Sequence, residues 1–136
     1  MKKVLLLSAG SPCRAIVCEY LLKKETRDIA GIEFCGAGLE YGKTISKNAE
    51  KILTQEGINL EDIQPRYLKD VVDEEYDLVV TVCDYSKEIS PVFPRAVRTL
   101  HMGFPSMSQE NELMCSELVS RIKLKMKPFI LKELGF

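Results

Sequence analysis

The chain has 136 residues, a formal net charge of −1, and 46% apolar residues. These values predict a single soluble domain spanning residues 1–136, and the near-zero charge gives no sign of a nucleic-acid partner. No apolar stretch approaches the roughly 20 residues of a membrane span, so we expect no membrane association.

Short apolar runs alternate with helix-period segments along the chain, which predicts a parallel sheet with helices on its faces. The expected elements, in chain order, are strand 3–7, helix 14–24, strand 32–35, helix 46–55, strand 78–83, a short helix 84–89, a weak strand 99–101 and helix 110–127. Pro128 should kink or end the last helix, because proline lacks a backbone donor. Right-handed crossovers then give an α/β fold with three layers, α/β/α, around a four-stranded parallel sheet.

The cysteines indicate the redox environment in which the protein works. The chain has five of them: Cys13, Cys18, Cys35, Cys83 and Cys115. The N-terminal apolar run is shorter than the roughly 7–15 residues of a secretory signal core. An odd number of cysteines without a leader predicts free thiols in a reducing cytoplasm. Because no CxxC pair is present, we expect no structural zinc site, and nothing in the sequence calls for a cofactor.

The loop between the first strand and the first helix begins at Ser8 and ends at Arg14. Ligands of parallel sheets bind beyond the carboxyl ends of the strands, and a helix start offers unpaired N–H groups and positive potential. Gly10 allows successive N–H groups to converge on an anion, and the Arg14 guanidinium can hold two oxygens at once. The loop therefore predicts an oxyanion site; its expected contributors are Ala9, Gly10, Ser11, Pro12, Cys13 and Arg14. An ordinary strand–helix turn with Arg14 as a surface charge is the alternative that spacing alone leaves open.

The run KVLLLSAGSPCRAIVCEYLL, residues 3–22, resembles the N-terminus of the low-molecular-weight protein tyrosine phosphatase family, which includes thioredoxin-coupled arsenate reductases. That family carries a Cys-x5-Arg loop, often C-T-G-N-S-C-R-S, where this chain has Ser8-x5-Arg14. The matching positions are Gly10, Cys13, Arg14 and an acidic residue in the first helix, Glu19. The departures within the loop and just after it are Ser11, Pro12 and Ala15.

Further landmarks follow in the family's order. Residues 36–38 resemble its S-A-G turn, and residues 48–49 with 57–60 resemble its second helix and the G-I-D-I segment. Residues 77–83 (DLVVTVC) are similar to the reductase strand D-L-V-V-T-L-C, and residues 101–104 (HMGF) to H-W-G-F. The resemblance covers nearly the whole chain, and it implies the family fold and a phosphate, arsenate or sulfate ligand.

The catalytic positions depart from the family. The family's nucleophile is a thiolate, whose pKa of about 8.5 falls at a helix start beside an arginine, whereas the Ser8 hydroxyl stays protonated unless a base takes its proton. The only histidine, His101, is not a base in the resemblance, and we expect it to be a hydrogen-bonded structural residue. Ser106 stands at the position of the general-acid aspartate, and serine is a poor acid at neutral pH. Asp84 is a candidate substitute.

The redox relay is also incomplete. Cys83 matches the first relay cysteine of the thioredoxin-coupled reductases, but Ser90 stands where the second would be. Pairing of Cys83 with Cys13 requires Cα atoms within about 7 Å. The alternative for Cys83 is a buried strand thiol that packs as a small hydrophobe, the role expected of Cys18, Cys35 and Cys115.

Two explanations of Ser8 remain open: a deliberate Cys-to-Ser exchange, or a natural relative that binds oxyanions without turning them over. The corresponding functions are an arsenate reductase or phosphatase (oxidoreductase or hydrolase) with Ser8, Arg14 and Cys83 at its catalytic positions, and an inactive pseudoenzyme that binds an oxyanion or a phosphorylated partner. The first would use thioredoxin or another thiol reductant. A third reading is an interaction domain with a vestigial loop.

Overall fold

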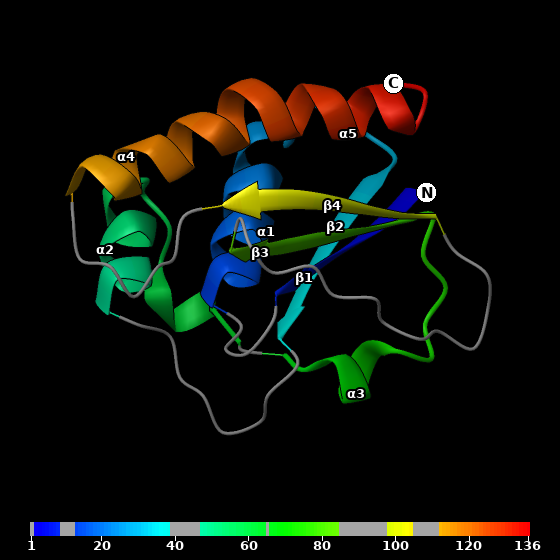
Figure 1. Cartoon of the computed structure of the whole chain (residues 1–136), viewed down its shortest axis with the longest axis horizontal. Coiled ribbons are helices and arrows are strands. Elements are labelled where there is room, and N and C mark those ends of the chain that lie inside the picture. The colour runs from blue at the N-terminus through cyan, green and yellow to red at the C-terminus, as the bar shows by residue number, and fades with distance from the viewer. Residues whose placement is uncertain (1, 9–12, 39–46, 65, 85–97, 105–111) are drawn as a thin grey trace.

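Four parallel strands form the central sheet of the computed structural model, in the order β2-β1-β3-β4 (Figure 1). The structure describes every residue except 1, 9–12, 39–46, 65, 85–97 and 105–111. The strands are β1 Lys2–Ser8, β2 Ile32–Gly38, β3 Leu78–Asp84 and β4 Thr99–Phe104. The predicted four-stranded parallel sheet is therefore confirmed, and the two weaker strands extend three residues beyond their predicted ends at 35 and 101.

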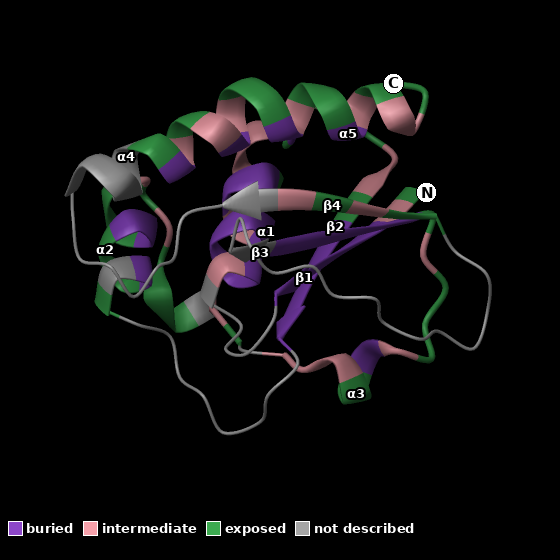
Figure 2. Cartoon of the chain, in the orientation of Figure 1, coloured by how far each residue is buried: buried purple, intermediate pink, exposed green. Residues whose placement is uncertain are grey.

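β1 lies inside the sheet because its apolar run can be covered on both faces. Val4 to Leu7 are all fully buried, and they divide between two clusters according to the alternation of a strand. Val4 and Leu6 belong to the larger cluster, while Leu5 and Leu7 belong to the smaller one on the opposite face. Figure 2 shows the buried strands β1 and β3 at the centre of the molecule.

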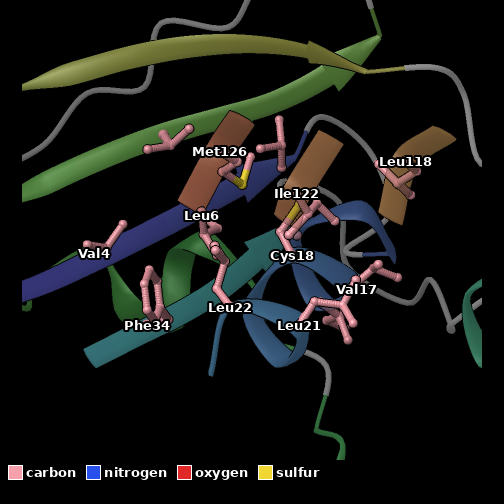
Figure 3. Close-up of a cluster of buried hydrophobic side chains, with 14 of the residues drawn as sticks. Val4, Leu6, Val17, Cys18, Leu21, Leu22, Phe34, Leu118, Ile122 and Met126 are labelled. Atoms are coloured by element: carbon pink, nitrogen blue, oxygen red, sulfur yellow. The ribbon is translucent and has the colours of Figure 1, made fainter. Parts of the chain in front are cut away.

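Helices cover both faces of this sheet. One side carries α1 Cys13–Glu25, α2 Lys47–Gln55 and the C-terminal helical segments α4 Glu112–Arg121, η2 Ile122–Met126 and α5 Lys127–Glu133. Their buried side chains, among them Val17, Leu21, Ile122 and Met126, belong to the same cluster as Val4 and Leu6 (Figure 3). The four-residue helix α3 Leu68–Val71 contributes Val71 to the smaller cluster. α3 and the 3₁₀ turn η1 Leu60–Asp62 were not predicted, because both are too short to show a hydrophobic period.

The C-terminal helix continues through Pro128, so of the two outcomes expected there, a kink or an end, the end is wrong. The π-helical segment η2 precedes the proline, and the Lys127 N–H donates to the Ile122 carbonyl five residues back. Pro128 then falls in the first turn of α5, where a backbone donor is not required. The predicted helix 84–89 falls almost wholly outside the described residues, and Asp84 itself belongs to β3. None of the described helices is long and apolar enough to cross a membrane.

Candidate functional site

Ser8 is the last residue of β1, and it is 1% exposed. It pairs in register with Gly38, the last residue of β2. The chain runs from β1 to β2 on one side of β1 and then returns to β3 on its other side, so the strand order reverses next to β1. Ligands of open parallel sheets bind at such a switch point, beyond the carboxyl ends of the strands. Ser8 thus lies at the edge of the sheet where ligands of open parallel sheets bind.

α1 begins at Cys13, five residues after Ser8 and one residue before the predicted start at Arg14. Its first turn contains no acidic side chain that would reduce the positive potential of the helix start. Arg14 is the second residue of α1; it is half-buried, and its Nη1 atom is shielded from solvent. Ala9, Gly10, Ser11 and Pro12 lie outside the described residues, as does the Cys13 side chain, and their anion contacts stay predictions.

The other predicted catalytic positions are only partly described. Cys83 lies on β3 opposite Gly103 of β4, near the carboxyl edge of the sheet, but its side chain is not described. Ser90 and Ser106 fall outside the described residues, so the relay and general-acid positions stay predictions as well.

His101 is a strand residue with a structural hydrogen bond. Its Nδ1 lies 2.8 Å from the Thr81 hydroxyl oxygen, and that hydroxyl is also within 3.3 Å of the Leu100 carbonyl, to which it can donate. The expected structural role of His101 therefore agrees with its contacts.

Glu19 is the centre of a buried polar cluster that the sequence did not reveal. Its side chain is fully buried on α1, and its Oε1 accepts the Gly36 N–H at 2.7 Å. Its Oε2 lies 2.5 Å from the Lys23 Nζ and 3.2 Å from the Arg66 Nη1. The spacing of Glu19 and Lys23 is a recognisable helical ion pair, but Arg66 is 47 positions away and no local pattern links it to Glu19.

Gly36 lets α1 approach the sheet at the level of the backbone. A Cβ atom at this position would lie 2.6 Å from the Ala15 carbonyl oxygen. Two residues further along β2, the Gly38 N–H donates to the Arg66 carbonyl at 3.0 Å, and Tyr67 forms a bridge with Gly38. These contacts set the start of α1 and the ends of β1 and β2 relative to one another.

Two cysteines are confirmed as packing residues. Cys18 and Cys35 are free and buried. Burial raises the pKa of the Cys18 thiol to about 12, and burial likewise raises the pKa of the Cys35 thiol. Neither thiol is therefore a nucleophile at neutral pH. Among the residues that the structure describes, no group of His, Cys, Asp or Glu side chains could hold a metal ion.

The chain matches the family model described as low molecular weight phosphotyrosine protein phosphatase over residues 3–113. It is 30% identical over 104 residues to arsenate reductase 1 of Bacillus cereus (strain ATCC 10987 / NRS 248). This match covers 76% of this chain and 75% of that protein. An arsenate reductase solved in the phosphate binding state shares the fold with a TM-score of 0.79 at 17% identity, covering 97% of this chain and 98% of that one.

A low molecular weight protein tyrosine phosphatase from T. tengcongensis also has this fold, with a TM-score of 0.75 at 16% identity and coverage of 97% and 99%. The family model spans most of the chain, from the first strand into the C-terminal helix. On this evidence the chain belongs to the low molecular weight phosphotyrosine protein phosphatase family.

Proposed function

We propose that this chain binds a tetrahedral oxyanion, phosphate or arsenate, at the start of α1 and that Ser8 leaves it without the family's thiolate chemistry. The observation that carries the proposal is the place of Ser8: a buried hydroxyl at the carboxyl end of β1, five residues before α1 begins. Family membership and the relative named as an arsenate reductase support the class of ligand, as does the neighbour solved with phosphate bound.

Electrostatics favour binding over turnover. A thiolate at this position would repel a dianion in the bound state, whereas a neutral hydroxyl can donate a hydrogen bond to one of its oxygens. The same hydroxyl is a poor nucleophile, because the pKa of a serine hydroxyl lies far above that of a thiol. The Ser8 form should therefore hold a free oxyanion without attacking it.

Calorimetric titration with inorganic phosphate tests the binding. We expect saturable binding to the unmodified chain and a loss of at least tenfold in affinity for Arg14→Ala, since a charge-assisted bidentate contact contributes roughly 1.5–3 kcal/mol. Arg121→Ala is the matched control, because Arg121 pairs with Glu117 on the C-terminal helix. Absence of saturable heat at millimolar phosphate would overturn the proposal.

Restoring the thiol tests the family relationship of the site. We expect Ser8→Cys to hydrolyse an aryl phosphate, or to reduce arsenate to arsenite while two thiols of an added reductant are oxidised to a disulfide. An external dithiol such as thioredoxin suits this chain, because Ser90 replaces the second relay cysteine. Such a reductant belongs to a reducing cytoplasm, where we place the protein. The unmodified chain and Ser8→Ala should both be inactive, and a Ser8→Cys variant inactive with both substrates would refute this assignment.

A further inference from the structure

Glu19 brings a negative charge close to a site that we propose for an anion. The carboxylate is fully buried on α1, and its Oε1 is fixed by the Gly36 N–H. Gly36 precedes Gly38 by two residues, about 6.6 Å along the strand, and Ser8 pairs with Gly38 about 4.8 Å across the sheet. The carboxylate is therefore on the order of 10 Å from the end of β1.

A bare carboxylate at this distance would weaken anion binding. At an effective dielectric constant of about 20, a charge about 10 Å away changes the affinity for a monoanion roughly tenfold, and more for a dianion. Salt screens such an effect less when the charge is buried than when it is exposed. Anion binding near the end of β1 therefore requires nearby positive charges that offset the negative charge of Glu19.

Two cationic side chains form ion pairs with the Glu19 carboxylate. Lys23 approaches it from one turn further along α1, and Arg66 approaches it from the segment that precedes α3. Burial lowers the pKa of Arg66 but the Glu19 carboxylate raises it, and the net direction is upward. Arg66 is therefore charged at neutral pH.

Arg66 is also held in place by its main chain. Its carbonyl oxygen accepts the Gly38 N–H at 3.0 Å, and the next residue, Tyr67, bridges to Gly38. One residue thus joins the end of β2, which neighbours Ser8, to the buried carboxylate of α1.

We propose that Arg66, together with Lys23, cancels the charge of Glu19 and so preserves the positive potential on which anion binding at the start of α1 depends. Arg66 is in this sense a positioning residue, acting through Glu19 and not as a ligand of the anion. The proposal rests on the proposed oxyanion site.

Phosphate titration of four variants separates charge from structure. Arg66→Met should raise the Kd for phosphate roughly tenfold, whereas Arg66→Lys, which keeps the charge, should stay within about threefold of the unmodified chain. The double variant Glu19→Gln with Arg66→Met should recover most of the lost affinity, because it removes one negative and one positive charge and so restores the net charge that the cluster of Glu19, Lys23 and Arg66 has in the unmodified chain. Arg121→Met is the control for the change in net charge, since its ion pair with Glu117 lies on the C-terminal helix, and it should bind phosphate as the unmodified chain does.

A double variant as weak as Arg66→Met would overturn the charge account and leave Arg66 a purely structural role. If Arg66→Met does not fold, Glu19→Gln alone decides: with both cations uncompensated, it should bind phosphate several-fold more tightly. Unchanged or weaker binding by a folded Glu19→Gln would refute the proposal.

The pKa of an introduced thiol provides a readout that does not require phosphate. In the Ser8→Cys background, Arg66→Met should raise the pKa of the Cys at position 8 by about one unit, and the added Glu19→Gln should reverse that shift. The rate of alkylation of this thiol as a function of pH measures its pKa in each variant. If the unmodified chain fails to bind phosphate, the proposed function is lost, and an unshifted thiol pKa would then remove this inference as well.

Discussion

At Gly36 the helix α1 approaches the sheet at the level of the backbone, and we expect Gly36→Ala to be costly. The added methyl group would lie 2.6 Å from the Ala15 carbonyl oxygen, a backbone atom that cannot move without shifting α1. Overpacking of this kind costs about 1–3 kcal/mol, and we expect that loss of unfolding free energy in urea titration. Glu33→Ala, an exposed position on the same strand, should change stability by less than about 0.5 kcal/mol. Equal stability of the two variants would contradict the close approach.

Cys18 makes stability depend on pH in the alkaline range. Burial raises the pKa of its thiol to about 12 from the ordinary value of 9.0, which the unfolded chain retains. The protonated thiol stabilises the fold fully below pH 9.0, and this contribution is lost as the pH rises toward about 12. The unfolding free energy should therefore fall more steeply over this range for the unmodified chain than for Cys18→Ala. Parallel curves, or rapid alkylation of Cys18 in the folded protein at pH 8, would contradict the expectation.

At the scale of the element, the C-terminal helix is held against the core by one stripe of buried side chains. Leu118, Ile122, Met126 and Ile130 recur at every fourth position and are all buried, although η2 interrupts the regular α-helix between them. Leu124 lies on the outer face and is 74% exposed. The π-helical turn thus keeps the stripe continuous on the core side of a helix that contains Pro128.

We expect Ile122→Ala to lower the unfolding free energy by about 2–5 kcal/mol, because it leaves a cavity between this helix and α1. Leu124→Ala, two positions away, should change it by less than about 0.5 kcal/mol. Thermal and urea unfolding of the two variants measure the difference. A Leu124→Ala loss comparable to that of Ile122→Ala would show that the outer face is also covered.

At the scale of the whole molecule, the strand order decides where a ligand can bind. The order β2-β1-β3-β4 puts the reversal beside β1, so Ser8 at the carboxyl end of β1 lies at the switch point where ligands of open parallel sheets bind. The larger cluster on the α1 side holds α1 and the C-terminal helix against the sheet, so the start of α1 is anchored by most of the core. A site built on this arrangement is positioned by the whole fold.

The sequence by itself determined the features that depend on near neighbours in the chain. The apolar run of β1, the helix period of α1 and the short loop between them are local patterns, and they predicted the parallel sheet and the place of Ser8 and Arg14. The substitution at Ser8 and its consequence for nucleophilic chemistry could also be read from the sequence, because the hydroxyl pKa is a property of the residue type.

Only the tertiary structure decided the contacts between distant segments. Glu19 and Arg66 are 47 positions apart, and Gly36 meets Ala15 through backbone atoms that no side-chain pattern records. The continuation of the helix through Pro128 likewise depends on the hydrogen bond from the Lys127 N–H to the Ile122 carbonyl. Burial of Ile122, Met126 and Ile130 on the core side favours this continuation over a break in the helix. The three features share one physical reason. A buried charge, a close backbone approach and a π-helical turn are all stabilised by packing among elements, and local propensity does not encode that packing.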